Sequence, residues 1–254
     1  MVQQPFQQEK NIYGGCKMNT IYFKNKKTEM IAHRGLSALE RENTNAAFVA
    51  AGNRSYFGIE TDVYATKDGV FVLHHDAMTK EGQLVIEEQD YETLKQVVMC
   101  DVDGELRNDL VLPLLTDYIR ICKKYNKKAI LEIKPKMDDE TVARLVDEIR
   151  QQDYLSGTIF ISFHWDNLIR LRALLPNQPL QFLVQREEEY SIEQLVQHQI
   201  DLDIYHKSVT KKMVKEIHKN GLLINCWTCN HIKDAERMVA CGVDFITTNV
   251  LEGK

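Results

Sequence analysis

Eight short apolar segments recur along the chain, and stretches with helically spaced apolar residues separate them. The expected strands are Met30–Gly35, Gly58–Thr66, Lys128–Lys134, Thr158–Phe163, Leu180–Gln185, Leu202–Tyr205, Leu222–Thr228 and Asp244–Thr248. Strands that are apolar on both faces and alternate with helices pair in parallel. No glycine-rich dinucleotide motif follows the first strand. Eight such units therefore predict an α/β fold with a single closed (β/α)8 TIM-type barrel.

Helical spacing is clearest in two of the intervening stretches. Thr141–Arg150 and Thr210–His218 carry apolar residues three and four apart. Thr210 is a suitable residue to cap a helix start, and Gly221 and Gly242 fall where helices should end. These signals predict helices between the strands, as a barrel requires.

Two segments fall outside the repeat. Residues 1–28 match no strong pattern, and we expect an N-terminal extension there, followed by a barrel domain over 29–254. Met18 is a candidate natural start, which would make residues 1–17 non-native. After the second strand, Phe71–Asp76 predicts a short hairpin strand, and residues 77–112 form an irregular insertion. Insertions of this kind commonly cover the active-site face.

Composition excludes several classes of protein. The formal net charge of -5 argues against general attraction to nucleic acid. No apolar run approaches the roughly 20 residues that cross a bilayer, and the polar N-terminus lacks the apolar core of a secretion signal. The 6 cysteines show no disulfide-framework spacing. We therefore expect a cytoplasmic protein without a membrane span.

Acidic residues interrupt two neighbouring strands. Glu60 and Asp62 lie two apart, as do Glu132 and Lys134, so each pair points to one face of its strand. Three carboxylates at one barrel mouth repel each other unless a cation lies between them. Oxygen ligands select a hard ion, Mg²⁺ or Ca²⁺. The alternative is that each acid pairs with a nearby base, for example Glu132 with Lys134.

Two histidines, His33 and His75, end the strands beside the acids. Phosphodiester cleavage needs one group to accept a proton from the nucleophile and another to protonate the leaving alkoxide, and imidazole serves both roles. A histidine at a strand end is more often a packed or capping residue. Two of them beside an acid cluster favour catalysis.

The spacing of Cys226 and Cys229 is that of a redox pair. However, the two cysteines fall in an expected strand, where residues three apart face opposite sides. A redox pair normally lies at a helix N-terminus. The sequence therefore disfavours a redox role.

The ordered motifs resemble the glycerophosphodiester phosphodiesterase family. His33–Ala51 begins with HRG and contains ENT, and Gly58–Asp76 contains an E-x-D-V-x-x-T-K-D-G run that ends in HD. The likeness continues through LEIK (131–134), SF (162–163), WT (227–228) and GVDFITT (242–248). HRG alone would be weak, but the ordered set is highly specific and covers nearly the whole expected barrel.

The resemblance implies roles for five of the residues above. Glu60, Asp62 and Glu132 would bind one divalent cation, either Mg²⁺ or Ca²⁺. His33 and His75 would be the acid/base pair, without an indication of which is the acid.

Four further residues receive roles from the resemblance. Arg34 and Lys134 would hold the phosphate through charge-assisted hydrogen bonds. Glu42 would lie near the barrel mouth and support the residues that contact the substrate or the metal. Trp227 would form part of the wall for the glycerol. For Trp227, plain core packing is an equal alternative.

The activity that the resemblance implies is hydrolysis of a small-molecule glycerophosphodiester to glycerol 3-phosphate and an alcohol. The nucleophile is either water or the glycerol hydroxyl of the substrate. The alternatives are a phosphodiesterase that acts on lysophospholipids or another phosphodiester, and a non-catalytic barrel that binds phosphorylated ligands. The sequence gives no indication of the oligomeric state.

Three positions and one segment depart from the pattern of the family. Arg41 stands where many members have proline, Asn45 replaces a leucine, and Asn249 replaces an aspartate that commonly follows the last strand. An R-T-T element after HD is absent from Ala77–Leu84. None of these changes removes an expected metal or proton-transfer residue. The missing R-T-T element, however, lies in the region expected to recognise the alcohol, so the sequence does not predict which alcohol is released.

Overall fold

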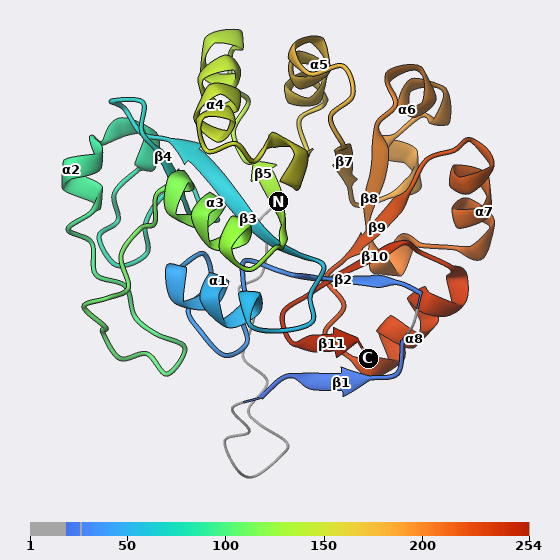
Figure 1. Ribbon diagram of the computed structural model, residues 1–254, viewed down its shortest axis with the longest axis horizontal. Helices are drawn as coiled ribbons and strands as arrows, with labels where there is room; N and C mark the ends of the chain where they lie inside the picture. Colours follow the sequence, from blue (N-terminus) through green and yellow to red (C-terminus); the bar gives the residue numbers. More distant parts are fainter. Residues whose placement is uncertain (1–18, 26, 254) are drawn as a thin grey trace.

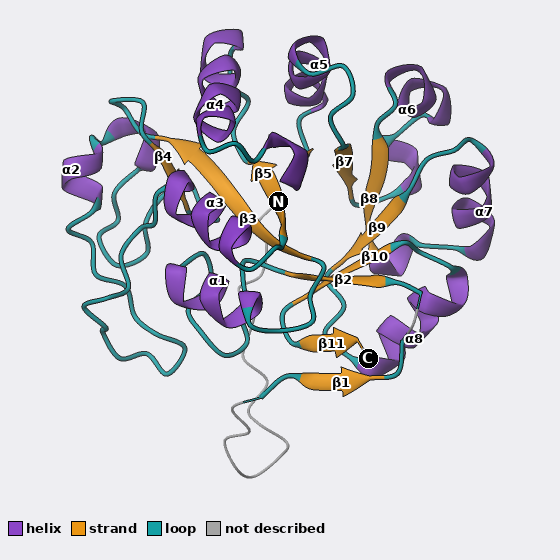
Figure 2. Ribbon diagram, in the orientation of Figure 1, coloured by secondary structure: helices purple, strands orange, loops and turns teal. Residues whose placement is uncertain are grey.

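Eight parallel strands close into a barrel in the computed structural model, which describes residues 19–25 and 27–253. Around the barrel the strands follow chain order, and β2 pairs with both β10 and β3 to close the ring. The predicted TIM-type α/β barrel is confirmed (Figures 1 and 2). The strands are β2 (Glu29–Ala32), β3 (Gly58–Ala65), β5 (Lys128–Ile133), β6 (Thr158–Ser162), β7 (Leu180–Val184), β8 (Asp201–Tyr205), β9 (Ile224–Trp227) and β10 (Phe245–Thr248).

Several strands are shorter than predicted because turns begin before the apolar segments end. β2 stops at Ala32, and the chain then turns through Arg34 (φ 55°) and Gly35 (φ 78°). A Cβ atom on Gly35 would lie 2.7 Å from Ala47, so this position combines a left-handed backbone with a close approach. The hairpin strand β4 (Phe71–Leu73) pairs antiparallel with β3 and likewise ends before His75.

A ring of helices covers the outside of the barrel. Thr210 accepts a hydrogen bond from the amide of Met213 at the start of α7, and Gly242 ends α8 at φ 92°. Gly221, at φ 75°, follows the cap of α7, so the predicted helix boundaries are confirmed there. The ring helices are α1 (Asn45–Gly52), α3 (Leu115–Lys124), α4 (Asp139–Gln151), α5 (Trp165–Leu174), α6 (Ile192–His198), α7 (Lys211–Lys219) and α8 (Ile232–Cys241).

The predicted insertion lies beside β4 and extends away from the barrel (Figure 1). It contains a 3-10 turn, η1 (Ile86–Glu88), and one short helix, α2 (Tyr91–Leu94). A small core holds it against β4. The buried members of that core include Ile86, Leu94, Met99, Leu110 and Leu112.

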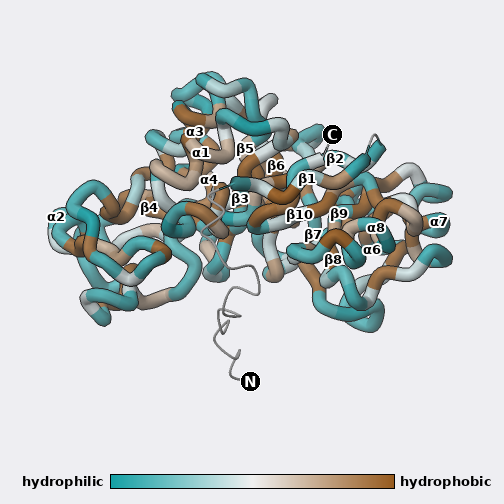
Figure 3. The backbone as a smooth tube through the Cα atoms, turned by 90° about the horizontal axis from the view of Figure 1, so that it is seen from below, coloured by the Kyte–Doolittle hydropathy of each residue, from teal (hydrophilic) through white to brown (hydrophobic). Residues whose placement is uncertain are grey.

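Apolar side chains form two main clusters in the barrel domain. In Figure 3 the strands near the centre are largely brown, and many of the surrounding loops are teal. The larger cluster lies between strands and helices. A smaller cluster fills the barrel itself and includes Ile31, Ile130, Ile161, Leu183 and Phe245.

The chain near each terminus forms a small second sheet. β1 (Ile21–Phe23) runs parallel to β11 (Leu251–Gly253), and the two strands lie side by side in Figure 1. Part of the expected extension thus packs on the barrel domain. The expectation that residues 1–17 are non-native lies outside the described residues. Within the described ranges, no helix is long and apolar enough to cross a membrane.

Candidate active site

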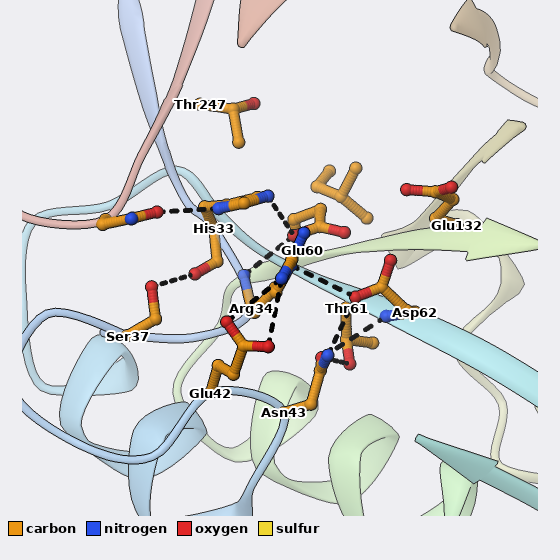
Figure 4. A network of polar contacts seen from close by, with 12 residues as sticks. His33, Arg34, Ser37, Glu42, Asn43, Glu60, Thr61, Asp62, Glu132 and Thr247 are labelled. Carbon is orange, nitrogen blue, oxygen red and sulfur yellow. Dashed lines mark hydrogen bonds and ion pairs between the residues drawn. The ribbon is translucent and has the colours of Figure 1, made fainter. Parts of the chain in front are cut away.

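Three acidic side chains meet at the carboxyl end of the barrel. Glu60 and Asp62 come from β3 and Glu132 from β5, where Asp62 and Glu132 are register partners. One carboxylate oxygen from each residue lies within 4.8 Å of the others. All three are buried, with 3%, 1% and 8% of their surfaces exposed. Figure 4 shows Glu132 beside the acids of β3. The alternation of two residues therefore places them as the sequence analysis expected.

The pairing of acids with bases is present but incomplete. The Lys134 ammonium lies 2.9 Å from Glu132 and 3.5 Å from Asp62, and Arg34 Nε lies 3.4 Å from Asp62. Glu60 accepts a hydrogen bond of 2.8 Å from the backbone amide of Arg34. Two side-chain cations thus face three buried carboxylates. Within residues 19–25 and 27–253, Asp62 Oδ1 also has no hydrogen-bond partner. The arrangement fits one additional cation.

The pKa values of the three acids reflect this shortage of positive charge. Burial, and then the neighbouring Asp62 and Glu132, raise the pKa of Glu60 well above its ordinary value. Burial and Asp62 raise the pKa of Glu132 to about 7. Burial also tends to raise the pKa of Asp62, but the charges of Lys134 and Arg34 outweigh this effect and lower the pKa. A hard divalent cation would relieve the repulsion, and the all-oxygen ligands suit Mg²⁺ or Ca²⁺.

Asn43 holds Asp62 in place, a role that the sequence analysis missed. Its Nδ2 donates to Asp62 Oδ2 at 2.8 Å, and its Oδ1 accepts from Thr61 Oγ1 at 2.6 Å. Asn43 adopts φ 53°, a left-handed backbone that asparagine tolerates better than most residues. It is 2% exposed. Its position directly after Glu42 in the ENT motif was the sequence feature that could have indicated this role.

Arg34 lies between two acids, as Figure 4 shows. Its Nη1 lies 3.0 and 3.1 Å from the two carboxylate oxygens of Glu42, which is the contact that Glu42 contributes at the mouth. Burial acts to lower the pKa of Arg34, but Asp62 and Glu42 outweigh it, so the guanidinium remains charged. A guanidinium fixed in this way is suited to bind phosphate oxygens.

His33 lies on one side of the acids. Its Nδ1 lies 2.7 Å from Asn249 Oδ1, and its Nε2 lies 3.9 Å from Glu60. Burial, with the charge of Arg34 next in size, lowers the pKa of His33 to about 3. The imidazole is therefore neutral at neutral pH.

His75 lies beyond the end of β4. Its Nδ1 is 2.8 Å from a carboxylate oxygen of Asp76, and its carbonyl oxygen accepts from the Tyr64 hydroxyl at 3.3 Å. Burial lowers the pKa of His75, and the charges of Asp62 and Arg34 act on it in opposite directions. Both predicted histidines thus feel the charges of the acid cluster.

Aromatic side chains lie across the mouth from the acids. Trp227 ends β9, and its ring lies 5.6 Å from the rings of Phe163 and Tyr205. Phe163 keeps 39% of its surface exposed. Phe163 follows β6, whereas Tyr205 and Trp227 end β8 and β9, so the three residues form an aromatic wall at the carboxyl ends of those strands. Trp227 was predicted from the sequence, whereas the contribution of Tyr205 was not, because it depends on the register that makes Tyr205 the partner of Trp227.

Residues 33–252 match the model of the Glycerophosphoryl diester phosphodiesterase family. The chain belongs to this family. Its members are hydrolases of phosphoric diesters, and the two histidines, the acid cluster and the aromatic wall all fall within the matched range.

Relatives cover most of the chain. A glycerophosphodiester phosphodiesterase of Caldanaerobacter subterraneus subsp. tengcongensis is 28% identical over 243 residues, which cover 88% of this chain and 94% of the relative. The crystal structure of a glycerophosphodiester phosphodiesterase from Parabacteroides distasonis superposes with a TM-score of 0.76 at 29% identity, covering 89% of this chain and 94% of that one.

A further solved structure carries a ligand. It is an Oleispira antarctica phosphodiesterase in complex with the product sn-glycerol-3-phosphate, with a TM-score of 0.78 and 26% identity. The superposition covers 88% of this chain and 93% of that protein.

Proposed function

We propose that this chain is a metal-dependent glycerophosphodiester phosphodiesterase that releases glycerol 3-phosphate and an alcohol. The observation that carries the proposal is the meeting of three buried carboxylates with two histidines near them: His33 Nε2 lies 3.9 Å from Glu60, and the charge of His75 acts on Asp62. The product bound to the phosphodiesterase of Oleispira antarctica supports the same product here.

Glu60, Asp62 and Glu132 would hold one divalent cation, Mg²⁺ or Ca²⁺. When bound, the cation would polarise a non-bridging phosphate oxygen and neutralise the carboxylates. Arg34 and Lys134 reach into the same region and would bind phosphate oxygens, because each already carries a positive charge toward Asp62. Glu42 keeps the guanidinium of Arg34 aimed at the mouth.

His33 would accept the proton of the nucleophile. Asn249 presents a neutral acceptor to Nδ1, which keeps the proton there and leaves the lone pair of Nε2 toward the site. The nucleophile is either water or the glycerol hydroxyl of the substrate. A transient cyclic glycerophosphate, detected by phosphorus NMR, would mark the second route.

His75 would protonate the departing alcohol. Its Nδ1 faces the carboxylate of Asp76, which stabilises the imidazolium that an acid requires. The negative phosphate of the substrate would act in the same direction. Two imidazoles with different partners thus divide the two proton transfers.

Trp227 would contact the glycerol, together with the neighbouring rings of Phe163 and Tyr205. The carbon atoms of glycerol would pack on these rings, while the acids across the mouth face its phosphate. An aromatic surface with a polar site opposite is typical of pockets for small polar ligands.

The test is release of glycerol 3-phosphate from glycerophosphocholine and glycerophosphoethanolamine, with and without EDTA. We expect turnover of at least one substrate, its loss in excess chelator, and its return with Mg²⁺ or Ca²⁺. Undiminished activity in excess chelator would overturn the metal assignment. Lysophosphatidylcholine as the preferred substrate would favour the lipid alternative, and binding of glycerol 3-phosphate without any turnover would favour the non-catalytic barrel.

A further inference from the structure

Ion pairs join the insertion to the β2–α1 loop, which comprises residues 33–44. Arg107 of the insertion lies 3.0 Å from the carboxylate of Glu40 in this loop. The next residue of the loop, Arg41, lies 3.6 Å from Glu81 of the insertion. Two consecutive residues of the loop are thus paired with charges of the insertion.

The residues that follow in the same loop belong to the active site. Glu42, directly after Arg41, binds the guanidinium of Arg34. Asn43 then donates to Asp62, and Figure 4 shows both side chains pointing to these partners. The amide of Asn43 also donates to the carbonyl oxygen of Arg34 at 3.0 Å, which closes the loop on itself. A displacement of the loop would therefore move a group expected to bind phosphate together with the support of an expected metal ligand.

Arg107 is held within the insertion before it reaches the loop. Its Nε and Nη2 atoms form a forked pair with the two carboxylate oxygens of Asp109, at 3.2 and 2.7 Å. Its Nη1 atom lies 2.6 Å from Asp101 and 3.0 Å from Glu40. Isolated surface ion pairs contribute little to stability, but a forked arginine in a network of carboxylates is an exception. Of these three carboxylates, only that of Glu40 lies outside the insertion, so the contact with the loop can be removed by itself.

Glu81 also has one contact inside the insertion and one outside it. Its Oε1 atom accepts a hydrogen bond of 3.1 Å from the amide of Cys100, and the same oxygen faces Nη2 of Arg41. The side chains of Arg41 and Glu81 are 19% and 12% exposed, so water and salt screen this pair less than a fully exposed one. Glutamine in place of Glu81 would keep the acceptor for Cys100 and remove the charge that faces the loop.

We propose that the insertion holds the β2–α1 loop in its binding conformation. Arg107 and Glu81 are the positioning residues, and they act through the loop rather than by touching the substrate. A loop that is already ordered loses less conformational freedom when the phosphate binds, so the substrate binds more tightly. The loop would contact the phosphate in the substrate and in the transition state alike, so its loosening should raise KM more than it lowers kcat. This effect on kinetics rests on the proposed function, whereas the order of the loop does not.

Steady-state kinetics of the double variant Glu40→Gln/Glu81→Gln test the effect on the site. The variant removes both charges that join the two segments and keeps the size of each side chain. For glycerophosphocholine we expect KM to rise by about threefold to tenfold, with kcat changed by less than about twofold. Asp109→Asn is the matched control, because it takes a carboxylate from Arg107 without removing a contact with the loop. Its KM should equal that of the wild type.

Hydrogen exchange tests the order of the loop without substrate. Peptides that cover residues 40–44 contain the amide of Asn43, whose hydrogen bond to Arg34 lies within the loop. We expect faster exchange there in Glu40→Gln/Glu81→Gln and wild-type exchange in Asp109→Asn.

Unchanged exchange and unchanged KM in the double variant would overturn the proposal, whatever its melting temperature. Equal effects in Asp109→Asn would overturn it too, because they would show a general response to lost charge. Faster exchange with unchanged KM would contradict the coupling to the site alone. Inactive wild-type protein would contradict the proposed function instead, and the exchange measurement would still decide whether the insertion orders the loop.

Discussion

The Nδ1 atom of His33 lies 2.7 Å from the side-chain oxygen of Asn249. The amide is a neutral partner at a position where an aspartate is common in the family. It orients the imidazole without adding a negative charge, and the buried ring keeps a pKa lowered to about 3. His33 is thus already unprotonated at the pH at which a general base must act.

Replacing Asn249 by aspartate should move the acidic limb of the kcat/KM profile to higher pH. A carboxylate against Nδ1 favours the imidazolium and raises the pKa of His33, by about 1–3 units for a close opposite charge. The base must be neutral to act, so as pH falls the variant loses activity at a higher pH than the wild type does. Asn249→Ser is the neutral control. An unmoved limb in Asn249→Asp would show that His33 does not govern it.

Removing either histidine should reduce turnover far more than binding. We expect His33→Ala and His75→Ala each to lower kcat for glycerophosphocholine by about 10²–10⁴-fold, the usual size of a general acid or base contribution. His231→Ala is the matched control, because His231 is exposed and its side chain makes no cap hydrogen bond on α8. Steady-state kinetics that left kcat unchanged in both site variants would refute the proton-transfer roles.

Asn43→Gly should weaken cation binding without unfolding the turn. Glycine accepts the φ of 53°, so the variant removes the hydrogen bond to Asp62 with little backbone strain. Loss of a group that orients a metal ligand commonly costs about 10–100-fold in affinity. Activity titrated with Mg²⁺ or Ca²⁺ should show this loss in the half-saturating concentration. If saturating cation fails to restore most of kcat, Asn43 does more than position Asp62.

Trp227→Ala should lower kcat/KM by about 10–100-fold, because a large apolar side chain contributes about 1.5–3 kcal/mol when buried against a ligand. Trp227→Phe keeps an aromatic surface and should lose much less. Leu174→Ala, at an exposed leucine at the end of α5, is the control for loss of apolar surface elsewhere. Equal activity of Trp227→Ala and the wild type would support plain packing of this residue.

The barrel and the acid cluster were predictable because both follow from short-range periodicity. Side chains two apart in a strand share a face, so Glu60 and Asp62 could be paired from sequence. Parallel neighbouring strands then carried Glu132 to the same end. The strand ends placed His33 and His75 beside the acids, and the motif order added support for their proton-transfer roles.

Contacts between distant parts of the chain were not predictable in the same way. The support of Asp62 by Asn43 depends on one left-handed residue in a loop. The meeting of Trp227 with Tyr205 depends on the register between β8 and β9, in which the two residues are partners. Cys229 lies outside β9, which ends two residues earlier, so the strand alternation expected for Cys226 and Cys229 does not extend to the second cysteine. Cytoplasmic location stays a prediction from composition.

Calorimetric titration of chelator-treated protein with Mg²⁺ or Ca²⁺ tests the central claim most directly. We expect one cation per chain in the wild type and binding weakened by more than about 100-fold in Glu132→Gln, which loses a direct ligand. Asp203→Asn is the matched control, because Asp203 is another buried acid of the barrel whose pKa burial raises well above its ordinary value. It should bind as the wild type does. Absence of binding of both cations to the wild type, or equal binding by Glu132→Gln, would contradict a metal site at Glu60, Asp62 and Glu132.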